Sequence, residues 1–457
     1  MGARSPARIA GVEEILGAAL ALAPGESPVE VRVAGGAGGR PRAVTNGRAP
    51  PTRNHATMDP VTTASPTRTP RVNPVMREDA RVTPLELFFD LVFVLALTQC
   101  TALMAAEPTW PGLAKGLVIL AVLWWSWVGY AWLTSVVDPE EGAVRLVIFA
   151  AMAALLVASL CVPQAFGDSA LLFAGAYAVV RGAHILLFVL ASRDDPDLRR
   201  SVTGLTGSTA LGVGLLFAAA LTTDGPRFAL WGLAVALDAG GPLVFGIEGW
   251  KLVPGHFAER HGLIVLIAIG ESIVAIGVGA QTGLDAGVVL AAVLGTAVAA
   301  AFWWLYFDVV ALVAERRLSR AAPGRDQNSM ARDSFSYLHF PMVAGIALVA
   351  VGMKKTLGHV DDPLRLVPAV AMLGGTATYL VAHVAFRLRN IGTLNKQRLL
   401  TAVVLLLLLP AATQLPSLAT LAILAGLLAL LIAYEAIRFA EARDRIRHQL
   451  GTMTSPD

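Results

Sequence analysis

From residue 81 onward, the chain alternates long apolar runs with short polar segments. Runs such as LVILAVLWWSWVGYAWL carry no charge over a length comparable with the roughly 20 residues that a helix needs to cross a bilayer. They are apolar on every side and lack the amphipathic stripe of a soluble helix. The pattern therefore predicts an all-α, polytopic transmembrane bundle of about twelve spans. The predicted spans are 85–105, 112–134, 144–163, 169–191, 202–222, 228–248, 261–280, 286–313, 336–353, 366–387, 398–415 and 417–438.

The sixth span departs from this simple pattern. It contains Asp238, the sequence Gly240-Gly241-Pro242 and, at its end, Glu248. We expect a broken or kinked helix here, because irregular backbone at membrane depth is tolerated where it lines a cavity or packs on protein.

Two terminal segments lack the apolar pattern. Residues 1–80 are rich in Pro, Arg, Gly, Ala and Thr, which predicts a disordered cytoplasmic tail. Glu13 and Glu14 precede its short apolar run, which is unlike a signal peptide. The alternative is that translation starts at Met58 or Met76. Residues 441–457 are predicted to be a cytoplasmic C-terminal tail.

The basic residues of the loops predict the orientation of the chain. Loops on one side of the predicted bundle hold most of them, including Arg316, Arg317 and Arg320 after the eighth span. The other side holds few, among them Arg227, Lys354, Lys355 and Arg365. Because Lys and Arg concentrate in cytoplasmic loops, we expect a multi-pass protein of the cell membrane with both termini in the cytoplasm.

Composition narrows the function classes further. The chain is 55% hydrophobic and 15% charged, whereas soluble domains carry about 25% charged residues. The net charge of +3 is small and spread over loops, so we expect the lipid bilayer as a partner and no nucleic acid. Cys100 and Cys161 lie in apolar segments, which offers neither a disulfide framework nor a zinc spacing. No cofactor or metal is expected.

Three ordered matches predict an internal repeat. Residues 83–100 align on 255–272, LWWSWVGY on FWWLYFDV, and RGAHILLF on LVAHVAFR. The second match sets Trp124-Trp125 on Trp303-Trp304, and the third sets His184 on His383. Six spans in each half give both halves the same orientation, so we predict two parallel six-helix repeats, 81–254 and 255–440.

Carboxylates within the apolar runs are candidate functional groups. A charge at bilayer depth costs at least about 2.5–3.5 kcal/mol, and it usually faces a partner or a water-filled cavity. Glu86 and Asp90 stand four residues apart on one helix face, which suits cation binding or proton exchange, or else pairing near the headgroups. Glu271 is the deepest carboxylate; it is either a functional site or an inter-helix hydrogen-bonding group.

The remaining candidates are two histidines and their charged neighbours. Arg181 and His184 share the predicted fourth helix, and His383 occupies the matching place in the second half. Such histidines either relay protons or bond to a neighbouring helix. Asp238 belongs to the irregular sixth span. Asp308 is expected to meet Glu271 or Arg181.

One polar cluster precedes the seventh span. His256, Glu259, Arg260 and His261 lack the spacing of a zinc-protease motif. We expect a loop cluster at the cytoplasmic interface; metal binding is the alternative.

Three segments together resemble a known family. ELFFDLVFVLALTQ, WWSWVGY and ERHGLIVLIAIGESIVAIG are similar to segments of the bacterial low temperature requirement protein A (LtrA) family. The resemblance covers residue 81 to about residue 440. It implies a polytopic membrane protein without an established biochemical activity, whose marked segments include Glu86, Asp90, His261, Glu271 and the Trp pair.

Three functions stay open at this point. The leading hypothesis is a transporter or channel for a small ion or solute that uses intramembrane carboxylates. The alternatives are a stress- or cold-adaptation membrane protein without flux of its own and a membrane-embedded lipid-modifying enzyme. No catalytic motif is found, so an enzyme is not expected.

Overall fold

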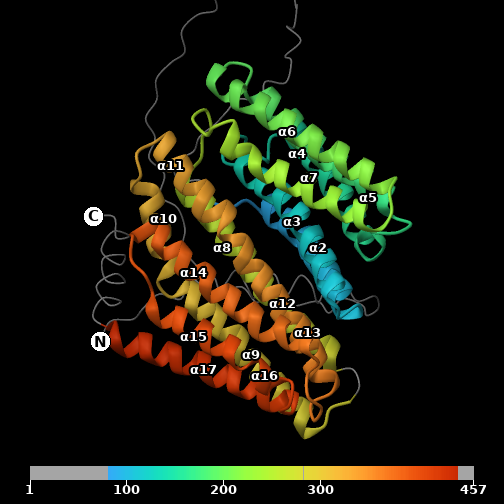
Figure 1. The fold of residues 1–457 in the computed structure, drawn as a ribbon. Coiled ribbons are helices and arrows are strands. Elements are labelled where there is room, and N and C mark those ends of the chain that lie inside the picture. The colour runs from blue at the N-terminus through green and yellow to red at the C-terminus, as the bar shows by residue number, and fades with distance from the viewer. Residues whose placement is uncertain (1–80, 281–282, 441–457) are drawn as a thin grey trace, which may run out of the picture. The chain divides into compact units, whose positions relative to one another are not determined.

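The computed structural model describes residues 81–440, apart from 281 and 282. Over these residues the chain is helical and contains no β-sheet (Figure 1). The helices of the predicted first half are α2 (Pro84–Ala106), α3 (Trp110–Leu133), α4 (Gly142–Cys161), η1 (Val162–Gln164), α5 (Ala170–Ala191), α6 (Pro196–Ala220) and α7 (Asp224–Val244). Those of the second half are α8 (Pro254–Gly279), α9 (Ala286–Phe307), α10 (Val310–Arg320), α11 (Arg325–Met330), η3 (Ala331–Tyr337), α12 (His339–Gly358), α13 (Leu366–Ala369), η4 (Val370–Gly374), α14 (Gly375–Ile391), α15 (Lys396–Leu407), α16 (Leu409–Ala412) and α17 (Ser417–Arg438).

Eleven candidate membrane spans, each long and apolar enough to cross a bilayer, are found among the described residues. Their outward faces are apolar: on α4, for example, Leu146 and Leu160 are 69% and 59% exposed. In water such a surface would be costly, whereas in a bilayer it contacts lipid tails. The prediction of an all-α polytopic membrane protein is confirmed.

Polar residues set the helix starts. Thr83 caps α2 in a capping box with Glu86. Asp195 caps α6 and also forms an ion pair with Lys251. Because Asp195 bonds to Lys251 and to backbone N–H groups, its pKa lies below the usual range. These contacts fix where helices enter the bundle.

The predicted eleventh span is not a single long helix. The predicted span 398–415 consists of α15 and α16, interrupted at Leu408 ahead of Pro410, which cannot donate a helical hydrogen bond. The segment nevertheless runs along the bundle: Asn395 bonds to Glu435 near the end of α17, while Ser417 donates its backbone N–H to Asp362, before α13. The count of twelve spans stays a prediction.

The sixth span was expected to be broken or kinked at Gly240-Gly241-Pro242. The α7 helix continues through these residues to Val244, so the span is not broken there, and a kink at Pro242 stays a prediction. Gly241 lies against Ser208 of α6, where an added Cβ would be 2.7 Å from the Ser208 hydroxyl oxygen. The glycine therefore permits close packing of α6 on α7. The polar cluster at 256–261 lies within α8, which begins at Pro254, so the prediction of a loop is wrong.

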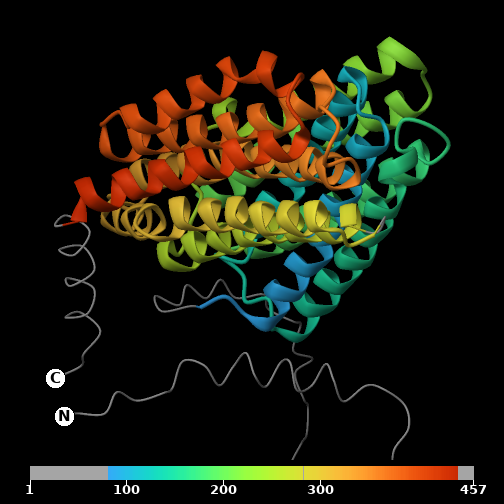
Figure 2. The same cartoon turned by 90° about the horizontal axis from the view of Figure 1, so that it is seen from below.

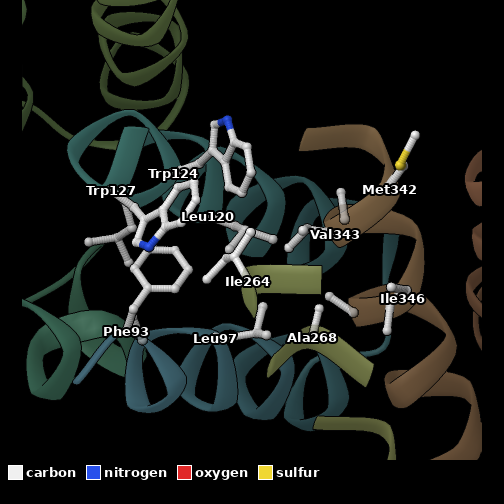
Figure 3. Close-up of a cluster of buried hydrophobic side chains, with 14 of the residues drawn as sticks. Phe93, Leu97, Leu120, Trp124, Trp127, Ile264, Ala268, Met342, Val343 and Ile346 are labelled. Carbon is white, nitrogen blue, oxygen red and sulfur yellow. The ribbon is translucent and has the colours of Figure 1, made fainter. Parts of the chain in front are cut away.

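The core lies where α2, α3, α8 and α12 meet. Phe93, Trp127, Ile264 and Val343 come from these four helices and are fully or almost fully buried together (Figure 3). Because α2 and α3 belong to the first half and α8 and α12 to the second, the largest apolar cluster joins the two predicted halves.

The helix neighbours follow the same scheme in both halves. In the first, α2 packs on α3 and α4, α4 on α5, and α3 on α7. In the second, α8 packs on α9 and α12, α12 on α14, and α9 on α17. In two views, α4–α7 gather on one side and α14, α15 and α17 on the other (Figures 1 and 2). This correspondence supports the predicted duplication, which remains a prediction.

Candidate functional site

Four ionisable side chains join α2 to α8 near the starts of both helices. Arg260 of α8 donates to Asp90 of α2 at 2.6 Å and lies 3.4 Å from Glu86. His256 bonds to Glu86 at 2.9 Å. All four are at most 3% exposed. We call Glu86, Asp90, His256 and Arg260 the α2–α8 charge cluster.

The α3 helix completes this cluster. The indole N–H of Trp127 donates to Asp90 at 2.7 Å, and Arg260 also donates to the Thr134 hydroxyl at 3.0 Å. Arg260 lies 5.5 Å from the Trp127 ring centroid, within reach of a cation–π interaction. Both carboxylates therefore have a positive or hydrogen-bonding partner, as buried charges require.

Glu271 lies at a second junction of α2 and α8. The Thr98 hydroxyl donates to it at 2.6 Å, and the Thr101 hydroxyl also donates to it. Lys354 of α12 forms an ion pair with Glu271 at 3.2 Å. The two predicted halves are thus held together by polar contacts at two levels of the α2–α8 interface.

Arg181 and Asp238 form the third buried group, inside the first half. Arg181 lies halfway along α5 and donates to Asp238 of α7 at 2.7 Å. Thr209 of α6 donates to Asp238 at 3.0 Å, and the Tyr177 hydroxyl donates to its other oxygen at 3.2 Å. Asp238 therefore joins three helices.

A cavity of about 60 Å³ borders this pair. We call it the first cavity. Its wall includes Arg181, His184 and Asp238, aromatic side chains of α3, and Arg332 and Ser336 from η3 of the second half. One water needs about 10–15 Å³ of such volume, so the first cavity has room for several waters or a small solute.

His184 is the unusual group in the wall of this cavity. The side chain is 1% exposed, and neither ring nitrogen forms a hydrogen bond of good geometry with any described residue. It lies against Gly129, where an added Cβ would be 2.8 Å from His184 Cε1 and 3.0 Å from a terminal nitrogen of Arg181. Glycine at 129 is what lets both side chains approach α3.

Three other histidines are buried in the second half. The rings of His261 and His339 lie 5.2 Å apart. The Tyr306 hydroxyl bonds to His339 Nε2 at 2.8 Å, and the Tyr306 ring lies 6.0 Å from His383. Among the described residues, no group of three or more His, Cys, Asp or Glu side chains is placed to hold a metal ion.

A second cavity, of about 220 Å³, lies between α9, α10, α14, α15 and α17. Its wall includes Trp304, Asp308, His383 and the ion pair between Arg398 and Glu435. Asp308 thus lies in the wall of this cavity. The polar contacts described above for Glu271 are with Thr98, Thr101 and Lys354, and Arg181 donates to Asp238.

The predicted site residues therefore occupy separate places. His184 and Asp238 border the first cavity, and His383 and Asp308 the second. Asp90 and Glu271 lie in the two polar junctions of α2 with α8. His261 packs among aromatic rings, 5.0 Å from that of Trp127.

Comparison with known proteins agrees with this architecture. Residues 81–433 match the family described as Bacterial low temperature requirement A protein (LtrA). The chain belongs to the LtrA family. It is 29% identical over 309 residues to an uncharacterized protein of Rhizobium meliloti (strain 1021), covering 65% of this chain and 74% of the relative. No solved structure matches this LtrA protein.

Several partners in this LtrA protein were missed by sequence reasoning. Lys354 was assigned to an outer loop but lies within α12. Glu435 is a carboxylate inside an apolar run, the same signal that singled out Glu271, and it was overlooked. Thr98, Thr101 and Thr209 carry no charge, so a search for ionisable residues could not find them.

Proposed function

We propose that this LtrA protein is a transporter of a small polar or charged solute, which it binds in the first cavity. The observation that carries the proposal is His184: a buried imidazole, without a good hydrogen bond among the described residues, in the wall of a cavity that also contains an ion pair. Leaving a buried polar group unpaired costs about 1–3 kcal/mol. A bound solute or water would supply the missing partner.

The Arg181–Asp238 pair suits such a site. Arg181 offers a planar, charged donor for an anionic group, and Asp238 an acceptor for a cationic one. Both side chains are held by other helices through Thr209 and Tyr177, so they are already oriented before a solute arrives. The arrangement fits a solute that carries charge or several hydrogen-bonding groups.

The contacts between the predicted halves support movement of one against the other. The first cavity is closed partly by Arg332 and Ser336 of the second half. The α2–α8 charge cluster and the hydrogen bonds from Thr98 and Thr101 to Glu271 join the same halves at two levels. In transporters built of repeats, one repeat rocks against the other around a site between them. These contacts are suited to act as gates that open alternately as one half moves against the other.

The test is flux through the full-length protein in liposomes. The solutes would be radiolabelled glycine, glutamate, lysine, acetate, sodium and rubidium. We expect at least one of them to cross faster than in empty liposomes, and His184→Phe and Asp238→Asn to reduce that flux at least tenfold. Lys115→Gln is the matched control, since Lys115 forms a partly exposed pair with Glu107 far from the cavity.

Two results would contradict the proposal. One is that the wild-type protein gives no flux of any of the six solutes. The other is flux that neither His184→Phe nor Asp238→Asn alters. Either result would favour the alternative of a membrane protein that aids cold growth without moving a solute itself.

A further inference from the structure

The second cavity occupies the place in the second half that the first cavity occupies in the first half. The sequence alignment sets Trp125 on Trp304 and His184 on His383. Trp125 and His184 line the first cavity, and Trp304 and His383 line the second. Each cavity also contains an Arg–carboxylate pair: the buried Arg181 with the buried Asp238 in the first, and the buried Arg398 with the partly buried Glu435 in the second.

One ring nitrogen of the histidine in the second cavity also lacks a partner. His383 is 2% exposed, and its Nδ1 bonds to the Tyr379 carbonyl at 2.9 Å. A carbonyl accepts, so Nδ1 carries the proton and Nε2 is an acceptor. Nε2 has no partner among the described residues. The Tyr306 hydroxyl, the nearby donor, bonds to His339 instead. Nε2 of His383 can therefore accept a hydrogen bond from a donor group of a ligand.

The charges around the cavity indicate the rest of the ligand. Two nitrogens of Arg398 donate to the Glu435 carboxylate, each at 2.9 Å, and the Asn395 amide also donates to Glu435. Arg387 and Asp308 add one charge of each sign to the wall. A ligand with charges of both signs would find a counter-charge for each of them.

We propose that the second cavity binds a molecule that joins a primary ammonium group to an oxyacid group. The ammonium donates to His383 Nε2 and faces the carboxylate side of the wall, while the oxyacid faces the arginines. A volume of about 220 Å³ accommodates a small amino acid. The same chemistry occurs in the headgroup of phosphatidylethanolamine. This site goes beyond the proposed function, because binding here does not require transport through the first cavity.

The test compares primary with quaternary ammonium compounds on the full-length protein. In phosphatidylcholine nanodiscs, glycine or serine should raise Tm by at least 2 °C more than equimolar glycine betaine, which has the same charges but no N–H to donate. A ligand that binds only the folded state raises its stability. Betaine also controls for the general stabilising effect of excluded osmolytes. A separate arm adds phosphatidylethanolamine to the nanodiscs and distinguishes a lipid headgroup from a free solute.

Variants tie the effect to the second cavity. His383→Phe keeps an aromatic ring and removes the acceptor, and Val313→Phe narrows the cavity without touching its charged groups. Both should abolish the difference between glycine and betaine, whereas Lys115→Gln, at a pair that lines neither cavity, should preserve it. The site is supported if a free amino acid or phosphatidylethanolamine stabilises the protein more than its quaternary counterpart and both variants of the second cavity abolish this difference. Equal shifts for primary and quaternary compounds in every arm, or a difference that survives in both His383→Phe and Val313→Phe, would overturn it.

Discussion

At the scale of single residues, the two candidate sites depend on histidines whose surroundings leave ring nitrogens unpaired. In a bilayer-embedded core, water cannot make up for a missing partner as it does on a soluble surface. The other buried charges described above have charged or hydrogen-bonding partners: Arg260 has Asp90, and Lys354 has Glu271. His261 Nε2 is also unpaired, but His184 and His383 border cavities as well, and this separates them from groups whose role is to hold helices together.

Gly129 should be indispensable for the first cavity. A methyl group at this position would force His184 and Arg181 away from α3, so Gly129→Ala should lower flux as strongly as His184→Phe and destabilise the protein by about 1–3 kcal/mol. Gly182→Ala is the matched control, because nothing lies within 4 Å of its added Cβ. Thermal unfolding in detergent and liposome flux measure the two effects. Equal behaviour of the two variants would contradict the packing argument.

At the scale of helices, the Glu271–Lys354 pair should be a strong link between α8 and α12. Removing one partner of a buried ion pair typically costs about 3–5 kcal/mol, because the other charge stays buried. Glu271→Gln and Lys354→Met should each lower Tm markedly, and the double variant should recover much of the loss. The exposed pair of Lys115 and Glu107 offers the control: Lys115→Met should change stability by about 1 kcal/mol or less. Additive losses in the double variant would argue against coupling.

The helices themselves were largely predictable from sequence. A long uncharged run inside a membrane satisfies its backbone hydrogen bonds by forming a helix. Accordingly, α2, α3, α4, α5 and α17 begin and end within two residues of the predicted bounds. The failures came from local backbone chemistry. Pro410 interrupts the predicted span 398–415, whereas Pro242 does not end α7, whose packing on α6 accommodates it.

The partners within the sites were much harder to predict. Arg260 and Asp90 are 170 residues apart in sequence, and Arg181 and Asp238 are 57 apart. Hydrophobic periodicity shows which face of a helix is buried but not which helix covers it. The sequence therefore suggested that Asp308 meets Glu271 or Arg181, and it could not show that Lys354 is the partner of Glu271.

At the scale of the whole molecule, the path of the chain predicts the positions of both ends. The segment containing α15 and α16 runs from the end of α14 to the level at which α13 begins. When the segment of α15 and α16 is counted as a crossing, the start of α2 and the end of α17 lie on the same side of the helical bundle. Green fluorescent protein fused after Asp457 should therefore fluoresce in bacterial cells, and alkaline phosphatase fused there should be inactive. An active phosphatase fusion would place the C-terminus outside and contradict the proposed orientation.

Transport through the first cavity requires that its wall be reached by water from both sides of the membrane. Val128 lines the cavity and is nearly the size of cysteine. In a Cys100→Ala, Cys161→Ala background, the most direct test is labelling of Val128→Cys by a membrane-impermeant thiol reagent, added to the inner or the outer face of sealed vesicles. Ala151→Cys, fully buried in the apolar core, is the control. We predict labelling of position 128 from each side and none of position 151; labelling of position 128 from only one side, or from neither, would contradict the account.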